Sequence, residues 1–402
     1  MNSTSHMPEL SARLAALDPA GADYAAAFVD LVLSAGQAQG ASDIHLEPTS
    51  NRLSVRWRLD GVLATVGQFP PGSSTNVINR LKVLAELLTY RTDVPQEGRI
   101  RSADLAQEMR VSTFPTIHGE KVVVRLFRSS GEFRRLADLG LPAAISDRLG
   151  KLLDETSGAV LVCGPAGSGK TTTLYACLRE IVARSGGRRN VVSLEDPVEV
   201  AIDGVAQSQV NVAAGFDLPT ALRSILRQDP EVILLGEIRD RQTAEVALQA
   251  SLTGQLVLTS FHASGTATAV SRLSDMGIEP YVLASGVRAV IAQRLLRRLC
   301  DCSIPAAAKM QPTTGISGTR VPVGCDSCAH TGYRGRLVVA EMLPLDEPAV
   351  VGAVLTRTDA ARMDALAREA GMTPLVAAAR AAVDAGQTTP AEVIRVLGLA
   401  AR

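Results

Sequence analysis

Hydrophobic spacing in the first 130 residues mixes two periods. Apolar residues recur at helical spacing in two stretches and alternate with polar residues in three others. The expected elements are helices over 24–39 and 76–89 and strands over 53–61, 109–114 and 121–127. The segment 53–61 carries the clearest signal, because four alternating apolar residues run into an Asp60-Gly61 hairpin turn. Helices mixed with antiparallel strands predict an α+β domain.

From Gly158 the pattern changes to short apolar runs that alternate with helical stretches. Strands are expected over 159–163, 190–194, 231–235 and 255–260, with helices over 171–184, 218–228, 240–253 and 264–275. Continuous apolar strands separated by helices are typical of a parallel sheet covered on both faces. Beyond Val282, helices are expected to dominate up to the C-terminus. The sequence therefore predicts an α/β domain after the α+β domain.

These patterns divide the 402 residues into two domains. Residues 1–20 are polar and rich in small side chains, so a flexible tail is expected there. The α+β domain is assigned to 21–128, a polar linker to 129–135 and the α/β domain to 136–402. The last of these includes a cysteine-containing element over 300–328 and C-terminal helices over 341–402.

Charge and composition narrow the class of partner. The chain has 41 basic and 41 acidic residues, and aromatic residues make up only 3% of it. Proteins that follow single-stranded nucleic acid generally use basic grooves and aromatic stacking platforms, so this composition argues against nucleic acid. The apolar runs are shorter than the ~18 residues of a membrane-spanning helix, and the amino terminus lacks a secretory signal. A cytoplasmic protein is expected.

A glycine-rich loop over 164–171 carries the strongest chemical signal. It fits G-x-x-x-x-G-K-[ST], follows an apolar strand and precedes a helical stretch, which is the context of a phosphate-binding P-loop. Lys170 is expected to neutralise phosphate charge, and the Thr171 hydroxyl to ligate Mg²⁺. The alternative is a glycine-rich turn with an accidental Lys-Thr pair. The expected nucleotide-binding residues are Gly164, Pro165, Ala166, Gly167, Ser168, Gly169, Lys170, Thr171 and Thr172.

Three polar segments follow other predicted strands of the same sheet. The carboxyl ends of parallel strands meet at one edge, where ligands bind, so we expect these segments to lie near the P-loop. Glu195 follows the strand over 190–194 and is expected to activate the attacking water. Glu237 follows the strand over 231–235, as a carboxylate facing Mg²⁺ does, and Asp240 is expected to cap the next helix. His262 follows the fourth strand.

Together these motifs resemble those of the secretion superfamily ATPases. The segment 194–199 resembles their Asp box, 236–240 their Walker B segment and 261–263 their His box, all downstream of a Walker A loop. The chain is most similar to the motors of type II secretion and type IV pilus assembly. The segments that resemble their second N-terminal domain are 41–48, 56–61, 96–99 and 118–121.

The resemblance implies a fold and a biological role. It implies a RecA-like P-loop domain, preceded by a smaller α+β (PAS-like) domain and followed by a zinc element and a helical C-terminal region. It further implies a homo-hexameric ATP hydrolase at the cytoplasmic face of the inner membrane, with inner-membrane platform proteins as partners. Such a motor powers pseudopilus or pilus subunit assembly and protein export in a type II secretion system. A type IV pilus or competence pilus motor is the alternative.

Two arginines of the first domain match the family's arginine fingers. Arg110 and Arg125 lie in predicted strands, where alternation points them away from their apolar neighbours Val111 and Val124. The alternative is a pair of solvated strand arginines. The family's assembly motors usually carry a further N-terminal domain that docks to the membrane platform. With about two dozen residues before the first helix, no room for that domain is expected.

Four of the six cysteines form two close pairs. Cys300 and Cys302 precede Cys325 and Cys328 by a spacing near that of four-cysteine zinc sites. The resemblance implies the tetracysteine element of assembly motors, although the first pair here has one intervening residue instead of two. Zinc is expected, together with ATP and Mg²⁺. Cys163 and Cys177 are expected to be buried small hydrophobes.

Two other classes of protein remain compatible with the P-loop. A RecA-like nucleic-acid translocase would share the loop and the ring, but the neutral charge and low aromatic content argue against it. A nucleotide-binding scaffold that switches without turnover would explain the unusual Gly236-Glu237 strand end. ATPase measurements with and without DNA separate both from a secretion motor.

Overall fold

The computed structural model describes residues 7–70, 74–101, 109–126, 135–306 and 319–398. It divides into two compact units, which are described separately. The smaller unit comprises residues 1–129 together with 300–303 and 322–335, and the larger unit comprises 130–299, 304–321 and 336–402. Apart from Arg135, the expected linker over 129–135 lies outside the described residues.

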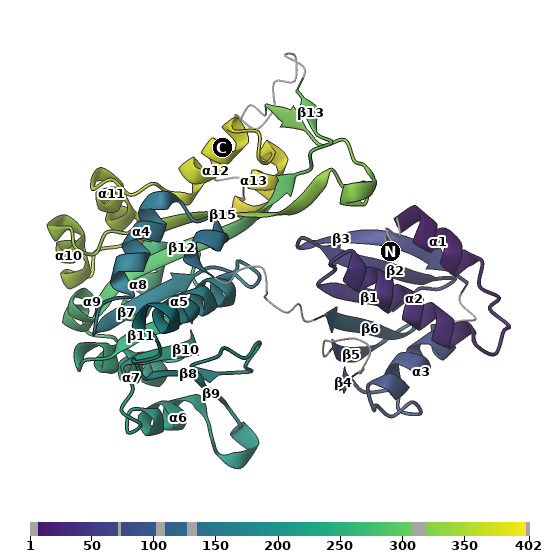
Figure 1. Cartoon of the computed structure of the whole chain (residues 1–402), viewed down its shortest axis with the longest axis horizontal. Helices are drawn as coiled ribbons and strands as arrows, with labels where there is room; N and C mark the ends of the chain where they lie inside the picture. The colour runs from purple at the N-terminus through teal and green to yellow at the C-terminus, as the bar shows by residue number, and fades with distance from the viewer. Residues whose placement is uncertain (1–6, 71–73, 102–108, 127–134, 307–318, 399–402) are drawn as a thin grey trace. The chain divides into compact units, whose positions relative to one another are not determined.

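A six-stranded antiparallel sheet forms the smaller unit (Figure 1). The strand order is β3-β2-β1-β6-β5-β4. The strands are β1 (Asp43–Pro48), β2 (Leu53–Leu59), β3 (Val62–Phe69), β4 (Gln96–Ile100), β5 (Met109–Thr116) and β6 (Gly119–Leu126). The helices are α1 (Met7–Ala15), α2 (Tyr24–Ala38) and α3 (Ser74–Leu84).

Alternation along the strands gives this sheet one apolar and one charged face. Leu53, Val55 and Trp57 of β2 are fully buried in a core that helical side chains complete. Intervening residues such as Arg56 and Arg58 are partly exposed. The predicted strands and the helix over 24–39 are confirmed, and the helix predicted over 76–89 is observed as Ser74–Leu84, since Glu86 has a left-handed backbone with φ 58°. The strands β1, β3 and β4 were not predicted. Apolar residues are few in β1 and β4 and do not alternate regularly in β3, so pairing with neighbouring strands decides all three.

The amino terminus differs from the expected flexible tail. Residues 7–15 form α1, in which Leu10 and Leu14 are buried at i and i+4 spacing. A helix of nine residues is marginal in isolation, so packing against the sheet supplies its stability. The small and polar residues of the segment led to the prediction of a tail, although its two leucines anchor a helix.

A buried ion pair joins α3 to β6 in the smaller unit. Lys82 Nζ lies 2.8 Å from Glu120 Oε1 and also donates to the carbonyl of Arg91 at 2.8 Å. Both side chains are buried, so each charge depends on the other. This pair fixes α3 and the segment that follows it against the sheet.

We expect Glu120→Gln to lower the free energy of unfolding of the smaller unit by about 3–5 kcal/mol, because it leaves a buried ammonium without its counter-charge. The fluorescence of Trp57, the single tryptophan of the chain, reports unfolding of this unit during urea titration. The double variant Lys82→Met/Glu120→Leu should regain most of the loss. Equal stability of wild type and Glu120→Gln would contradict the assignment.

The larger unit is built on a seven-stranded sheet of order β15-β12-β7-β11-β10-β8-β9, with parallel pairing from β12 to β9. Its strands are β7 (Gly158–Cys163), β8 (Val191–Glu195), β9 (Ala206–Gln209), β10 (Val232–Ile238), β11 (Leu256–Phe261), β12 (Val287–Leu299) and β15 (Tyr333–Leu343). Its first helices are α4 (Ala143–Leu152), α5 (Lys170–Ser185), α6 (Leu218–Ile225), α7 (Arg241–Leu252), α8 (Thr266–Asp275) and α9 (Pro280–Gly286).

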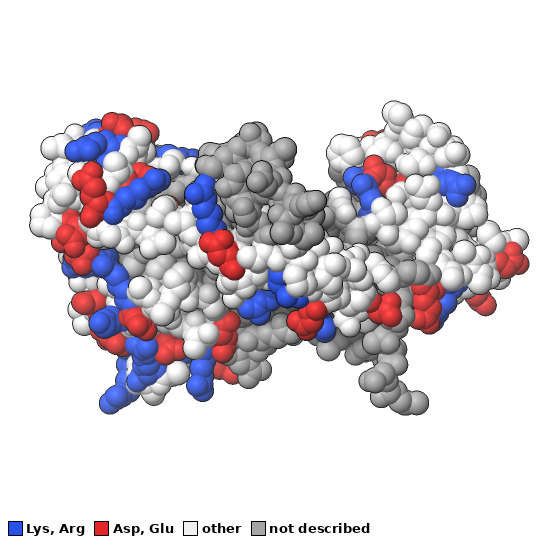
Figure 2. Space-filling model, turned by 90° about the horizontal axis from the view of Figure 1, so that it is seen from above, with Lys and Arg blue, Asp and Glu red and all other residues white. Residues whose placement is uncertain are grey.

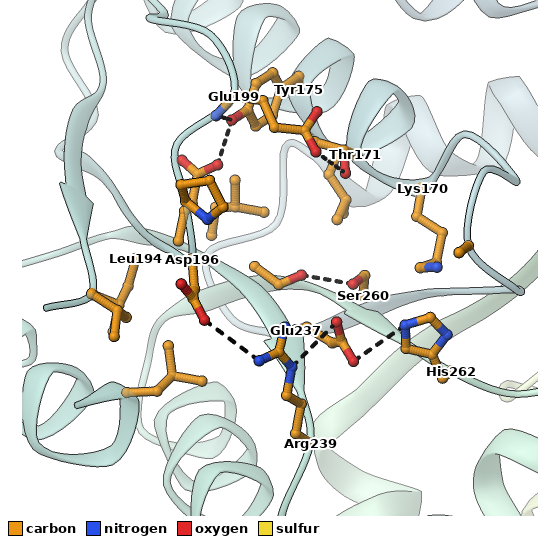
Figure 3. Close-up of a pocket in the computed structure, with 18 of the residues that line it drawn as sticks. Lys170, Thr171, Tyr175, Leu194, Asp196, Glu199, Glu237, Arg239, Ser260 and His262 are labelled. Atoms are coloured by element: carbon orange, nitrogen blue, oxygen red, sulfur yellow. Dashed lines mark hydrogen bonds and ion pairs between the residues drawn. The ribbon is translucent and has the colours of Figure 1, made fainter. Parts of the chain in front are cut away.

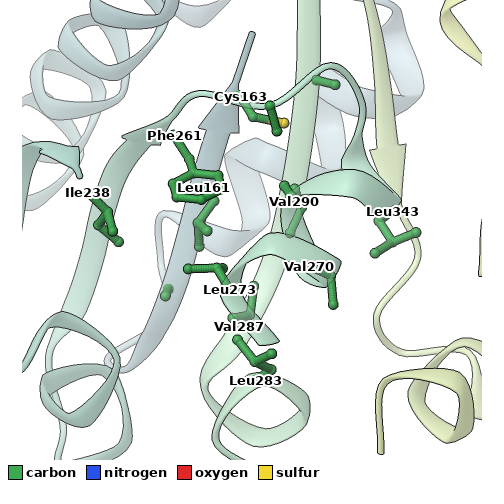
Figure 4. Close-up of a cluster of buried hydrophobic side chains, with 14 of the residues drawn as sticks. Leu161, Cys163, Ile238, Phe261, Val270, Leu273, Leu283, Val287, Val290 and Leu343 are labelled. Carbon is green, nitrogen blue, oxygen red and sulfur yellow. The ribbon is translucent and has the colours of Figure 1, made fainter. Parts of the chain in front are cut away.

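Buried side chains fill both faces of this sheet. Alternate residues of β7 enter two different clusters: Leu161 and Cys163 pack on one face, and Val160 and Val162 on the other. Figure 4 shows the first cluster, in which helical side chains such as Leu273 meet the strand residues. A sheet buried on both faces explains the continuous apolar strands in the sequence, and the predicted parallel sheet is confirmed.

The C-terminal region differs from the expected run of helices. The strands β12 and β15 are 13 and 11 residues long and form one side of the large sheet. Among the described residues after β12, the α-helices are α10 (Pro348–Leu355), α11 (Ala360–Glu369), α12 (Leu375–Asp384) and α13 (Pro390–Leu397). Arginines interspersed among apolar residues of β12 made its period ambiguous, and pairing with β7 decides it. Within the described ranges, no helix is long and apolar enough to cross a bilayer.

Candidate functional site

A pocket of about 440 Å³ opens where the central strands of the large sheet end (Figure 3). The P-loop after β7 contributes Lys170 and Thr171, and the carboxyl ends of β8, β10 and β11 with the residues that follow them contribute acidic and histidine side chains. The pocket residues that the sequence predicted are Ala166, Gly167, Lys170, Thr171, Glu195, Glu237 and His262. The sheet therefore brings together four segments that are up to 100 residues apart.

Two positions of the P-loop require glycine, one because of its backbone conformation and one because there is no space for a Cβ. Gly169 has φ 88° and begins α5 in a left-handed conformation. At Gly164, a Cβ would lie 2.5 Å from Ser168 Oγ and 2.8 Å from Gln293 O. Lys170 Nζ donates to the carbonyls of Gly164 and Pro165, at 2.9 and 3.0 Å, and burial lowers the pKa of this ammonium. A cation folded over a loop at a helix N-terminus fits a phosphate.

Gln293 of β12 holds the P-loop and the start of α5 through two hydrogen bonds. Its Nε2 donates to the carbonyl of Ser168 at 2.7 Å, and its Oε1 accepts from Thr173 Oγ1 at 3.0 Å. The next residue, Arg294, donates to the carbonyl of Ser264 at 2.7 Å, two residues after His262. Sequence reasoning missed both residues because β12 was expected to be helical. A buried glutamine beside arginines in an apolar strand was the available signal.

The carboxylate of Glu237 is paired with His262 at the ends of β10 and β11. His262 Nε2 lies 3.3 Å from Glu237 Oε1, and Arg239 Nε lies 3.5 Å from Oε2. The pairing of β10 with β11 shifts register between Leu235 and Ile238, around the Gly236-Glu237 pair. The predicted cap of α7 is confirmed, since the Asp240 side chain accepts from Thr243 N at 2.8 Å.

The acidic segment after β8 presents two glutamates differently. Glu195 is 4% exposed, and its carboxylate accepts hydrogen bonds from Tyr175, Ser193 and Gln207. Glu199, which was not singled out from the sequence, has Oε1 3.5 Å from Thr171 Oγ1. Asp196 pairs with Arg239 at 3.4 Å. Of the two glutamates, Glu199 is the one that faces the P-loop hydroxyl expected to bind Mg²⁺.

Arg110 and Arg125 lie in the smaller unit as direct cross-strand partners on β5 and β6. Val111 and Val124 are fully buried, which confirms that the arginines point to the opposite face. Arg125 is 62% exposed and lies 3.0 Å from Asp43. Arg99 of β4 stands opposite Arg110 in the same row, so this face concentrates positive charge.

Cys300, Cys302, Cys325 and Cys328 converge in one cluster, with their Sγ atoms within 4.8 Å of one another. Three Sγ–Sγ separations are 3.8, 3.9 and 3.9 Å. Four thiolates at 2.3 Å around a tetrahedral zinc would stand about 3.8 Å apart, so the cluster fits this ion. The Cys325 and Gly332 amides donate to Cys328 Sγ at 3.2 Å. Cys163 and Cys177 are fully buried, as expected.

Comparison with known proteins places the chain in one family. The family model described as type II/IV secretion system protein matches residues 20–395. The chain is 40% identical over 382 residues to type II secretion system protein E of Aeromonas hydrophila, over 92% of this chain and 75% of the relative. It is 44% identical over 330 residues to type II secretion system ATPase E of Vibrio cholerae, over 80% of this chain and 65% of the relative.

Among solved structures, the ATPase DotB of Legionella pneumophila has this fold, with a TM-score of 0.68 over 93% of this chain and 95% of that one, at 21% identity. The P-loop, the paired Glu237 and His262 and the match along nearly the whole chain lead to one assignment. The chain belongs to the type II/IV secretion system protein family and is one of its P-loop ATPases.

Proposed function

We propose that this chain hydrolyses ATP to drive pseudopilus subunit assembly and protein export in a type II secretion system. It would act as a homo-hexamer at the cytoplasmic face of the inner membrane, docked to platform proteins of the machine. The observation that carries the proposal is the pocket that Lys170 and Thr171 line together with five acidic residues and His262. The relatives named for type II secretion favour this machine over a type IV or competence pilus.

Four residues of the pocket have separate proposed tasks. Lys170 would neutralise the β- and γ-phosphates, and Thr171 and Glu237 would hold Mg²⁺ and its waters, which supply charge neutralisation when bound. His262, 3.3 Å from Glu237, would link this carboxylate to the segment after β11.

Water activation is assigned to Glu199. The sequence pointed to Glu195 for this step, but both oxygens of Glu195 accept hydrogen bonds from buried neighbours. Glu199 Oε1 lies 3.5 Å from the Thr171 hydroxyl, so it stands beside the P-loop, within reach of a water next to that hydroxyl. Arg110 and Arg125 would serve as arginine fingers for the phosphoryl group, and the four cysteines would hold zinc.

Nucleic acid is not proposed as a partner. On the face of the larger unit shown in Figure 2, basic and acidic side chains are interspersed. Interspersed charges do not provide the continuous positive track that binds a phosphate backbone.

The test is Mg²⁺-dependent ATP hydrolysis by the purified full chain, with Lys170→Ala as the measure of background. Turnover above that background is expected, and DNA should not stimulate it. A deletion strain that loses export of type II substrates and regains it with the wild-type gene identifies the machine. Restored pilus extension with unchanged export would favour the pilus alternative, and a hexamer without turnover would favour a scaffold.

A further inference from the structure

We propose that Tyr175 is a positioning residue for hydrolysis, which holds Glu199 against the P-loop through a buried hydrogen-bond hub at Glu195. The inference rests on the proposed function, because it explains how Glu199 is placed for the step assigned to it. Tyr175 lies on α5, the helix that begins at the P-loop, and is 2% exposed.

The hub is a buried carboxylate whose two oxygens both accept hydrogen bonds. Tyr175 Oη donates to Glu195 Oε2, while Ser193 Oγ and Gln207 Nε2 donate to Oε1 at 2.7 and 3.1 Å. These donors come from α5, β8 and β9. A buried carboxylate without donors is strongly destabilising, so the three donors lock its orientation.

The direction of the Tyr175 hydrogen bond follows from its chemistry. A backbone N–H can only donate, so Tyr175 Oη accepts from the Glu199 amide and its single proton is left to point to Glu195 Oε2. The lone pairs of Tyr175 Oη then accept from the Glu199 backbone N–H at 3.2 Å (Figure 3). Burial raises the pKa of Tyr175, which keeps the phenol protonated. One hydroxyl therefore joins Glu195 to Glu199.

Two residues on one face of α5 contact Glu199. Thr171 and Tyr175 are at i and i+4 on α5, and residues with this spacing share one face. Thr171 Oγ1 lies 3.5 Å from the Glu199 carboxylate, and Tyr175 Oη binds the Glu199 amide. The position of Glu199 is thus fixed to the helix that carries the P-loop.

Gln207 forms hydrogen bonds with the backbone of the residues that follow Glu199. Its Nε2 donates to the carbonyl of Val200 at 3.1 Å, and its Oε1 accepts from Ile202 N at 2.6 Å. The segment 199–202 is held on one side by Tyr175 and on the other by Gln207. Losing the Tyr175 hydroxyl frees the end of the segment that carries Glu199, while the other end stays anchored.

The variant Tyr175→Phe tests the proposal, because it keeps the ring packing, including the contact with Arg179 5.9 Å above the ring, and removes only the hydroxyl. We expect kcat for ATP to fall about tenfold, with KM within twofold of wild type, since no P-loop contact involves this hydroxyl. Tyr175→Phe/Glu199→Gln should be no slower than Glu199→Gln alone, because Tyr175 acts through Glu199.

Matched controls separate positioning from stability. Ser193→Ala removes another donor to Glu195 without touching Glu199 and should lower kcat less than Tyr175→Phe. Tyr281→Phe removes the hydroxyl of an exposed tyrosine and should leave kcat unchanged. Equal losses in Ser193→Ala and Tyr175→Phe, a wild-type kcat in Tyr175→Phe, or a further tenfold loss in the double variant would overturn the proposal.

Amide hydrogen exchange tests the contact without relying on turnover. The Glu199 amide of the nucleotide-free wild-type protein should be protected, and Tyr175→Phe should accelerate its exchange. An unprotected Glu199 amide in the wild type, or unchanged exchange in the variant, would overturn the proposal. Absence of wild-type turnover refutes the proposed function instead, and the exchange result still decides whether Tyr175 holds Glu199.

Discussion

Arg110→Ala and Arg125→Ala each lower kcat for ATP hydrolysis by about 10³-fold in the assembled ring, if these residues act as arginine fingers. A guanidinium presents a planar fork of donors that matches phosphate oxygens and stabilises charge that develops on the transferred group. An exposed strand arginine without this role would contribute almost nothing. The size of the loss therefore distinguishes the two interpretations.

The structure makes Arg125 available for such a role. The Arg125 side chain, which forms an ion pair with Asp43, is 62% exposed. Solvent therefore screens this attraction, and a phosphate can replace the Asp43 carboxylate. Arg110 stands directly opposite Arg125, and both lie on the charged face of the sheet. Two adjacent guanidinium groups repel each other, and a bound polyanion relieves that repulsion.

The measurement is steady-state hydrolysis by variants whose hexameric state has been checked by light scattering. Arg52→Ala, which removes an exposed arginine from the turn between β1 and β2, should retain wild-type kcat. Arg125→Lys should stay close to Arg125→Ala, because an ammonium cannot replace the bidentate fork. Unchanged rates in both alanine variants would rule out the finger role.

Cys325→Ser should abolish zinc binding, whereas the wild-type protein purified without added zinc should contain about one equivalent per chain. Structural zinc in small domains contributes about 10–16 kcal/mol of binding free energy that is coupled to folding. The variant should therefore lose order in the cysteine element, with lower thermal stability. Elemental analysis and thermal unfolding measure the two effects.

Cys177→Ala provides the control for the zinc prediction, because this thiol is buried in α5 and lies outside the cluster. It should retain the full equivalent of zinc. A chelator should reproduce the effect of Cys325→Ser in the wild type and have no further effect in the variant. Metal-free wild-type protein that melts at the same temperature with and without added zinc would refute the site.

For the cysteine element, the sequence and the structure each supply part of the evidence for a zinc site. Spacing alone suggested a four-cysteine site, and the single intervening residue between Cys300 and Cys302 left its geometry open. The structure places the thiols at separations that fit a tetrahedral ion. Convergence of the two pairs depends on the paths of β12, which ends just before Cys300, and β15, which begins after Cys328, and neither strand was predicted.

By itself, the sequence determined the parts of this protein that depend on local order. The P-loop of 164–171, the parallel strands around it and the row of acidic and histidine motifs are local patterns, because glycine conformation and hydrophobic period act over a few residues. Tertiary structure decided the rest. Only the pairing of strands made β12 and β15 strands, buried Glu195 among donors from three elements, and set Glu199 beside Thr171. Side-chain environment is a property of neighbours brought together by folding, so a motif can identify the acidic segment without saying which carboxylate faces the P-loop.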